Sequence, residues 1–402
     1  MTSGSTERPA RIQPLQVSAY TITSALGSGR AAHVAALTAE RTGLEQKRFE
    51  TCHLECWIGD AGALDQPVPE ALARWDCRNN RLAWQALQQD DFLASVAEIR
   101  RRYGARRIGV YVGTSTSGVH ETELAYRNRD RAANRLPARF DHVHTSSTHS
   151  VAAFVREALA IEGPAAAIST ACSSSAKVFA SAWRAMAAGQ CDVAVVGGVD
   201  SFCLTTLYGF NSLQLVSQEI CRPADAARNG ISIGEAGGFA ILERGAGARM
   251  FLGYGETSDA YHMSSPPPDG RGAAGAMRGA LARGGLAPGE IDYVNLHGTA
   301  TPANDLAEDR AVHAVLGATI PASSTKGWTG HALGAAGILE AAISLLCIEQ
   351  GFLPRSLNLR TLDPALQSNV LRESRRAHVR HVLSNSFGFG GSNCSLLFGA
   401  GQ

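Results

Sequence analysis

The sequence has 402 residues and a mass of 42.3 kDa, which is more than one ordinary hydrophobic core needs and favours two domains or one large layered body. Hydrophobic residues make up 45% of the chain, charged residues only 18%, and there are 42 glycines, as in a tightly packed enzyme. The 37 Lys and Arg nearly balance the 36 Asp and Glu, so the formal net charge is +1. Because no global field favours nucleic acid or an anionic membrane, we expect neither as a partner.

Cysteine usage and hydropathy indicate the compartment. The nine cysteines are scattered singly, and no charged and then apolar signal sequence precedes them, which predicts a reducing, cytoplasmic setting. The most apolar long stretch, residues 332–348, is interrupted by Glu340 and is shorter than the ~20 residues that cross a bilayer, so we expect no membrane insertion. Residues 1–9 are polar enough for a frayed start, and the folded body is expected to begin near Arg11.

Short apolar runs alternate with alanine-rich stretches along the chain. The runs are bounded by glycine or polar residues and are typical of buried strands: residues 107–112, 165–168, 192–196, 239–242 and 293–296. The stretches between them have helical spacing, as in residues 177–188 and 332–349. The alternation predicts an α/β protein.

Two segments of the chain share one plan. Residues 168–175 lead from a strand past Cys172 into a helix of small residues, and residues 323–331 lead past Lys326 and His331 into another. This weak similarity predicts two related halves that meet at a shared site. The boundary falls near Arg244, which gives an N-terminal half of residues 11–244 and a C-terminal half of residues 245–402.

Cys172 is the candidate nucleophile. A cysteine at the turn from a strand into a helix lies near unpaired backbone N–H groups and the positive end of the helix dipole, which predicts a lowered thiol pKa. The neighbours Ala171 and Ser173 to Ser175 are small enough for a substrate to approach. For each of the other eight cysteines the sequence favours a structural role.

Two histidines stand at corresponding places in the predicted C-terminal half. His297 ends a strand and enters a glycine-containing loop, and His331 precedes the second small-residue helix. A single histidine is more often a satisfied core or surface residue, but placement of both at strand ends predicts imidazoles in one cleft.

The C-terminal glycine-rich run, residues 384–393, permits unusual backbone conformations. Such a turn can present a backbone N–H as an oxyanion donor, and Phe389 within it can serve as a hinged gate. By contrast, Cys52 and Cys56 have no second pair of ligands at metal-binding spacing, so we predict no metal site there.

Together these residues carry a resemblance that covers nearly the whole chain. The sequence resembles the β-ketoacyl-acyl-carrier-protein synthases of the elongating, thiolase-fold type, which are condensing enzymes and acyltransferases. The matching stretches are residues 113–118 (GTSTSG), 170–175 (TACSSS), 221–225 (CRPAD), 259–266 (DAYHMSSP), 296–302 (LHGTATP), 326–337 and 385–391 (NSFGFGG). The resemblance implies a five-layered αβαβα fold built from two related βαβ-type halves.

The resemblance also implies roles for individual residues. Cys172 accepts the acyl chain, and His297 and His331 hold the malonyl thioester carbonyl as neutral Nε2–H donors while carbon dioxide leaves. The backbone N–H groups of Cys172 and Phe389 form the oxyanion hole. The resemblance implies two further pairs. Lys326 and Glu340 form an ion pair that fixes His331, and Thr299 and Thr301 form hydrogen bonds to the phosphopantetheine of the substrate.

Departures from the family pattern concern the pocket rather than the catalytic groups. They are Ala224, Leu296, Ala300 and Asn304. They bear on the acyl chain that is accepted, and residues 114–124 resemble specialised polyene synthases as much as those of fatty-acid synthesis.

The implied partner is an acidic acyl carrier protein, which carries the substrates on phosphopantetheine, and no other cofactor is implied. Because the chain is nearly neutral, we expect docking on a local basic patch near the tunnel mouth. Arg127 and Arg131, with Arg129 and Arg135, form one candidate, and Arg78 with Arg81 forms a second. The family also implies a homodimer or a heterodimer with a related subunit.

Three other functions agree with part of the pattern but not with all of it. A chain-length-factor-like subunit keeps the fold but lacks the nucleophile, so Cys172 argues against it. A thiolase needs a second reactive cysteine near the C-terminal turn. The nearest candidate, Cys394, comes after that turn in a predicted strand, which argues against a thiolase. A starter synthase would carry Asn at the second histidine position, where this chain has His331.

Overall fold

The computed structural model describes residues 10–401, so the frayed start predicted for residues 1–9 lies outside it. Its main feature is a large mixed sheet made of two half-sheets. In the first, the strands lie in the order β6-β5-β7-β9-β1, and in the second in the order β12-β11-β16-β17-β10. Their bounds are β1 Leu15–Ser24, β5 Ile108–Gly113, β6 Ala165–Ile168, β7 Val193–Asp200 and β9 Ala236–Glu243 in the first half. In the second they are β10 Arg249–Ser258, β11 Tyr293–Asn295, β12 Pro321–Ser323, β16 His381–Gly388 and β17 Ser392–Ala400.

The two half-sheets repeat one topology. In each, the strands follow the spatial order third, second, fourth, fifth and first in sequence. The first three strands in this spatial order are parallel, and each of the remaining two pairs antiparallel with the strand before it. A short antiparallel contact joins the halves, where Leu15 and Gln16 pair with Phe251 and Met250. The two related halves are thus confirmed, and the predicted boundary at residue 244 falls in the turn between β9 and β10.

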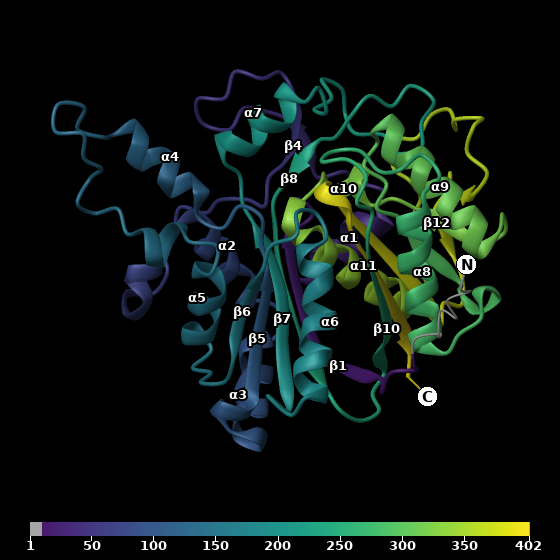
Figure 1. Ribbon diagram of the computed structural model, residues 1–402, viewed down its shortest axis with the longest axis horizontal. Helices are drawn as coiled ribbons and strands as arrows, with labels where there is room; N and C mark the ends of the chain where they lie inside the picture. The colour runs from purple at the N-terminus through teal and green to yellow at the C-terminus, as the bar shows by residue number, and fades with distance from the viewer. Residues whose placement is uncertain (1–9, 402) are drawn as a thin grey trace, which may run out of the picture.

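Helices form three layers around and between the half-sheets (Figure 1). One outer layer packs on the first half-sheet, with α2 (Arg78–Leu87), α3 (Phe92–Tyr103) and α5 (Ser150–Ala158). The other covers the second, with α8 (Arg271–Gly284) and α9 (Pro302–Leu316). Between the sheets lie α6 (Ser174–Ala187) and α11 (Ala336–Gln350), each of which contacts strands of both halves. This arrangement is the predicted αβαβα architecture.

The remaining elements lie around the ends of the sheets. The helices are α1 (Arg30–Thr38), α4 (Val119–Arg127), α7 (Leu204–Ser212) and α10 (Lys326–Thr329). Short strands extend the sheet or form two small ones: β2 (Gly27–Ser28), β3 (Leu44–Gln46), β4 (Trp57–Gly59), β8 (Ile233–Gly234), β13 (Phe352–Leu353), β14 (Asn369–Val370) and β15 (Arg375–Arg376). Helix α4 and the chain that follows it extend away from the body at the upper left of Figure 1.

The apolar stretch near residue 340 is a core helix. By length and composition residues 333–350 would cross a membrane, but 83% of them are buried inside the protein. The helix begins at Ala336, four residues later than predicted, because residues 333–335 form a tighter 3₁₀ turn. Here Leu333 takes a positive φ of 51°, a conformation that interrupts an α-helix.

The starts of α6 and α11 cross closely, and this crossing builds the site. A Cβ on Gly337 would lie 2.3 Å from the backbone nitrogen of Ala176, so only glycine permits this approach. The Ile338 N–H donates to Ser175 Oγ at 3.0 Å across the same contact. The residues that precede the two helices, Cys172 and His331, are therefore brought together.

Candidate active site

Cys172 lies in the turn between β6 and α6 and is only 4% exposed. The preceding residue, Ala171, has a φ of 53°, an uncommon conformation for a residue with a side chain. The turn places the Cys172 sulfur within hydrogen-bond reach of the backbone N–H of Phe389, from the C-terminal glycine-rich run. The nucleophile of one half is thus matched with an N–H donor of the other.

The expected lowering of the thiol pKa is wrong for the resting protein. Burial raises the pKa of Cys172 to about 12, although the Lys326 charge and the Phe389 N–H oppose this. A dry site destabilises a thiolate more than a helix terminus and one buried cation stabilise it. The thiol is therefore the resting form.

His331 is the immediate neighbour of the thiol. Its Nε2 lies 3.0 Å from Cys172 Sγ. Its backbone is fixed to the first half, because its N–H donates to the Ser232 carbonyl and its own carbonyl accepts from the Gly234 N–H. The imidazole is held against the sulfur by strand-like pairing with β8.

His297 completes the group. Its ring centre is 5.4 Å from that of His331, and the two planes are nearly perpendicular. Lys326 Nζ lies 3.5 Å from His297 Nδ1. Because an ammonium can only donate, Nδ1 acts as the acceptor, and the proton of the neutral ring is then on Nε2. His297 is thereby set up as an Nε2–H donor.

Both imidazoles are neutral. Burial, followed by the charge of Lys326, lowers the pKa of His297 and of His331 well below the ordinary histidine value. Neutral rings can donate hydrogen bonds without carrying charge into the buried site.

Lys326 and Glu340 form the buried ion pair that the family resemblance implies, but they support a different histidine. Lys326 also donates to the backbone carbonyl of His297, and Ser386 Oγ donates to Glu340 at 3.3 Å. Burial raises the pKa of the Glu340 carboxyl, and the adjacent Lys326 opposes that rise. The expectation that the pair fixes His331 is corrected, because its contacts are with His297.

Two buried carboxylates near the site were not singled out from the sequence. Glu308, on α9, accepts the backbone N–H groups of His297 at 2.8 Å and Gly298 at 2.7 Å, and burial raises its pKa to about 7. Asp200 accepts from Thr114 Oγ1 at 2.7 Å and from the Gly334 N–H at 2.6 Å, which ties the loop after β5 to the turn after His331. Glu308 follows Asp305 at helical spacing, a pattern that could have indicated it; Asp200 has no local signal beyond its strand end.

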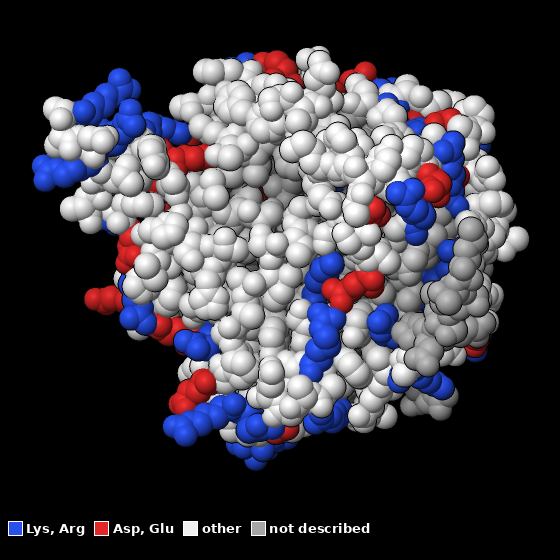
Figure 2. Space-filling view, viewed as in Figure 1, with Lys and Arg blue, Asp and Glu red and all other residues white. Residues whose placement is uncertain are grey.

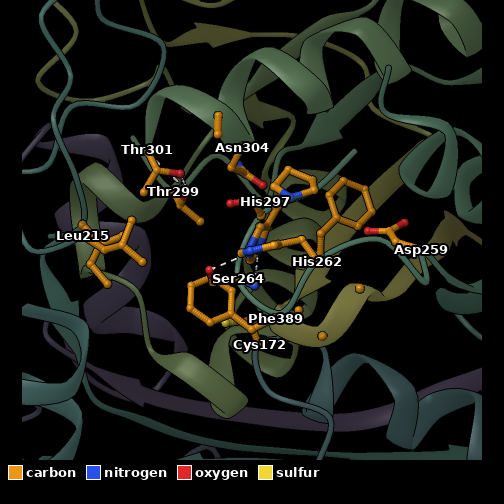
Figure 3. Close-up of a pocket in the computed structure, with 18 of the residues that line it drawn as sticks. Cys172, Leu215, Asp259, His262, Ser264, His297, Thr299, Thr301, Asn304 and Phe389 are labelled. Atoms are coloured by element: carbon orange, nitrogen blue, oxygen red, sulfur yellow. Dashed lines mark hydrogen bonds between the residues drawn. The ribbon is translucent and has the colours of Figure 1, made fainter. Parts of the chain in front are cut away.

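The three groups open into a pocket of about 250 Å³ (Figure 3). Cys172, His297 and His331 line its inner end, and Thr299 and Thr301, whose hydroxyls are 2.9 Å apart, line one wall. The rest of the lining is largely apolar, with Phe210, Leu215, Ile231, Phe387 and Phe389. The Phe389 ring contacts that of Phe210, with centroids 5.6 Å apart. The pocket is therefore largely apolar, and the Cys172 thiol is part of its lining.

The donor atoms of Cys172, His297 and His331 lie within 4.8 Å of one another, a spacing that could also suit a metal ion. The prediction of no metal is not tested by this geometry. Cys52 and Cys56, rejected as a metal half-site from the sequence, are buried in a small hydrophobic cluster beneath α7.

Comparison with known proteins identifies the family. The chain matches the N-terminal domain of β-ketoacyl synthases over residues 77–248 and the C-terminal domain over residues 250–360. A mitochondrial 3-oxoacyl-[acyl-carrier-protein] synthase of Arabidopsis thaliana is 38% identical, over 78% of this chain and 72% of that protein. A 3-oxoacyl-[acyl-carrier-protein] synthase 2 of Rhizobium meliloti is 36% identical, over 72% and 73%. The chain belongs to the β-ketoacyl synthase family.

Comparison with solved structures supports the same family. The fold matches a structure of the ketosynthase ApeO in complex with its chain length factor ApeC from Xenorhabdus doucetiae, with a TM-score of 0.89, 36% identity and coverage of 96% of this chain and 98% of that one. A β-ketoacyl synthase from Burkholderia phymatum matches with a TM-score of 0.85 and 27% identity, over 97% of this chain and all of that one. The predicted family, the thiolase-like fold and an enzyme of the acyltransferase class are confirmed.

The departures from the family pattern do not reach the catalytic groups. Ala224 and Ala300 both have positive φ, of 65° and 64°, and their N–H groups donate to the two oxygens of buried Asp305 at 3.0 and 3.1 Å. They hold the loop that follows His297. Asn304 lines the pocket, and Leu296 is in the core beside β11.

In this β-ketoacyl synthase, Cys394 lies in the hydrophobic core on β17 and does not line the pocket of Cys172. Burial raises the pKa of its thiol. The second reactive cysteine of a thiolase therefore has no counterpart in the described pocket.

The predicted basic patch lies on residues 119–146, hereafter the arm, which comprises α4, the chain after it and the turn at His142–Ser146. Arg127 and Arg131 are exposed there with Arg129 and Arg135, and Figure 2 shows blue side chains gathered at this projection. Glu50 pairs with Arg127 at 3.4 Å, whereas no ion pair among the described residues includes Arg131.

The prediction that Arg78 and Arg81 form a second docking patch is corrected. Arg78 is 19% exposed, and its guanidinium bonds to the fully buried carboxylate of Glu235 at 2.7 Å. Arg81 pairs with Asp76. Arg78 therefore neutralises a buried charge and does not present a free cation for docking.

Proposed function

We propose that the protein catalyses the decarboxylative Claisen condensation of malonyl-acyl carrier protein with an enzyme-bound acyl group, giving 3-oxoacyl-acyl carrier protein. The observation that carries this proposal is the buried group of Cys172, His331 at 3.0 Å from its sulfur, and His297 beside it, all lining one largely apolar pocket. Names of relatives at up to 38% identity support it.

In the first half-reaction, Cys172 Sγ attacks the thioester carbonyl of an acyl carrier protein. The acyl carbon forms a bond to Sγ and breaks its bond to the pantetheine sulfur, which leaves with the proton that the thiol gives up. His331 Nε2 is placed to hold that proton during the transfer. Since the resting thiol is neutral, proton movement accompanies attack instead of preceding it.

In the second half-reaction, the malonyl thioester takes the vacated pocket. Nε2–H groups of His297 and His331 donate to its thioester carbonyl and stabilise the enolate that forms when the carbon–carboxylate bond breaks. The enolate carbon then attacks the acyl-Cys172 carbonyl, the carbon–sulfur bond breaks, and the thiolate takes up one proton. Neutral rings suit this role, because their hydrogen bonds strengthen as negative charge develops.

The surrounding groups complete the chemistry. The Phe389 N–H, which already points to the Cys172 sulfur, is placed with the Cys172 N–H to receive the oxyanion of each tetrahedral step. The Thr299 and Thr301 hydroxyls on the pocket wall are placed to bind the polar amides of the phosphopantetheine arm. We propose that the reaction needs no further cofactor, because these groups supply the nucleophile, proton carriers and donors.

The alternative, a non-catalytic chain-length-factor-like subunit, is not favoured. Such a subunit has no use for a nucleophile, whereas Cys172 here lies against both histidines and an N–H donor.

We also propose that the protein works as a dimer, with a second copy or with a related chain length factor, as ApeO does with ApeC. Strand β6 supports this, because it is an uncharged edge strand that leads directly into the nucleophile turn and pairs on one side only. Unprotected edges of this kind favour pairing with another chain. Tyr126, Leu136 and Val143 of the arm add exposed apolar area.

The pathway is fatty-acid or polyketide biosynthesis, of which a specialised polyene route is one form. The curated relatives are named for 3-oxoacyl-[acyl-carrier-protein] synthesis, and the matched structures include the ishigamide ketosynthase with its chain length factor. Nine free cysteines, all within the described residues, support the proposed cytoplasmic location.

The decisive experiment supplies purified protein with malonyl-acyl carrier protein and a panel of acyl-acyl carrier proteins. We expect mass spectrometry to show an acyl group on the peptide that contains Cys172 and a 3-oxoacyl product on the carrier protein. The retained acyl groups would define the chain preference. Absence of both adduct and product with every acyl group would refute the proposal.

A further inference from the structure

Exposed large hydrophobic side chains fall in only two places in the part of the chain that the structure describes. Three are the arm residues Tyr126, Leu136 and Val143. The other four are Tyr208 at 38%, Leu213 at 50%, Tyr261 at 53% and Met263 at 77% exposure. Soluble proteins seldom group such residues at one place unless it binds something.

The second set, hereafter the mouth cluster, surrounds the opening of the Cys172 pocket. Tyr208 and Leu213 each lie two residues before a residue that lines the pocket, Phe210 and Leu215 respectively. Tyr261 and Met263 lie on either side of His262, another lining residue. Figure 3 shows Leu215 and His262 on different sides of the pocket. The four side chains therefore belong to two segments that border the same opening.

The mouth cluster is also joined to the glycine-rich gate. The Gly390 N–H donates to the Met263 carbonyl at 2.8 Å, and the Phe389 ring contacts Phe210. A partner bound to residues 204–218 or 260–268 would thus contact segments that lie next to Phe389, whose N–H faces Cys172.

Charge is absent from both segments. Residues 204–218 contain no Asp, Glu, Lys or Arg, and neither do residues 260–268. The surface of the mouth cluster is therefore apolar and neutral, whereas the arm carries exposed arginines.

We propose that the mouth cluster is a docking surface for the acyl carrier protein. An apolar patch of the carrier protein, next to its phosphopantetheine group, would pack against Leu213 and Met263. This proposal rests on the proposed function. The occupant follows from continuity with the pocket, because a protein that delivers a chain through this opening must cover its border. A second copy seated there would instead cover the opening that these two segments border and hinder the delivery of an acyl chain to Cys172.

Apolar docking has a different signature from docking on arginines. Salt screens contacts between exposed charges, but it does not weaken burial of apolar surface. The mouth cluster should therefore provide the part of carrier-protein binding that survives high salt.

The test uses full-length protein carrying Leu213→Asn with Met263→Gln, which keep side-chain size but remove apolar surface. We expect the Kd for a labelled acyl carrier protein to rise about tenfold, by a similar factor at ~0.05 M and ~0.5 M NaCl. The KM for a short acyl-pantetheine mimic should stay within about twofold, because the mimic does not touch the border. Leu136→Asn, on the arm, is the matched control; its expected effect is on subunit association, with the ratio of carrier-protein to mimic KM unchanged.

Three results would overturn the proposal: an unchanged Kd for the carrier protein, an equal loss with the mimic, or a change of oligomeric state of the double variant in analytical ultracentrifugation. The last would assign the mouth cluster to a second chain. Because binding is measured directly, a wild-type protein that binds the carrier protein but forms no 3-oxoacyl product would refute the proposed function and leave the docking surface standing.

Discussion

The catalytic centre and the arm place their charges in opposite environments. At the centre, Lys326 and Glu340 are both almost completely buried and satisfied by one another, and the two histidines are neutral. On the arm, Arg129, Arg131 and Arg135 are exposed to solvent and take part in no ion pair among the described residues.

This difference separates two kinds of function. Inside the dry centre an electrostatic contact is strong and geometry decides its effect, whereas at the surface it is weakened by water and by salt. Substitutions at the centre should therefore change chemistry strongly at any ionic strength. Charge substitutions on the arm should change association with the carrier protein moderately, and mainly at low salt.

The largest effect is expected at the nucleophile. Cys172→Ala should abolish both self-acylation and condensation and leave the fold intact, because only a sulfur is removed from a small buried turn. Mass spectrometry and thermal unfolding measure these two outcomes. Cys191→Ala, which removes another buried thiol outside the pocket, is the control.

Cys172→Gln extends this test. Its side-chain amide mimics the acyl group, so decarboxylation of malonyl thioester should remain measurable while condensation is lost. Condensation by Cys172→Ala at the wild-type rate would disprove the assignment of the nucleophile.

The next largest effect is expected for His297→Ala. Decarboxylation should fall on the order of a hundredfold or more, because a donor to the developing enolate is lost. Transfer of the acyl group onto Cys172 should fall much less, since His331 is the histidine that contacts the sulfur. Separate assays of the two half-reactions measure this, with exposed His313→Ala as control. Equal loss of both half-reactions in a stable protein would contradict the division of labour.

The thiol's environment gives a pH prediction. Burial raises the pKa of Cys172 to about 12, so the thiolate fraction should increase tenfold with each pH unit below that value. Alkylation by iodoacetamide should accordingly speed up about a hundredfold between pH 6 and 8, without a plateau. The measurement is the rate of loss of the free Cys172 peptide. A plateau below about pH 8 would show that the helix terminus dominates over burial.

The smallest effect is expected on the arm. Arg127→Glu with Arg131→Glu should raise the apparent KM for acyl carrier protein about tenfold at low salt, because two exposed cations that face an acidic partner are reversed. The effect should shrink as salt rises and be absent with short pantetheine mimics. Steady-state kinetics at two salt concentrations measures it. Arg41→Glu with Arg372→Glu makes the same charge change at other exposed arginines, and an equal loss there would show that only net charge matters.

Much of the catalytic centre could be predicted because local sequence builds it. A strand, a tight turn and a small-residue helix place Cys172 at a helix start, and the same plan places His331, so short motifs identify both. Strand β6 was predicted to the residue, since four apolar residues between Pro164 and Ser169 have few alternatives. The two related halves also followed from two similar segments, whereas the order of the strands came from the structure.

The tertiary structure decided the charge state of buried groups and the partners that come from distant parts of the chain. Whether the Cys172 pKa rises or falls depends on how completely the fold removes water from the turn, and no local pattern reports that. Which histidine Lys326 supports depends on the crossing of loops 29 residues apart in sequence. Arg78 looked free for docking, because its carboxylate partner lies 157 residues further along the chain. Sequence thus determined which groups are present and the turns that hold them, while packing determined their charge states and partners, since both follow from the water and the neighbours that only the folded chain brings to each group.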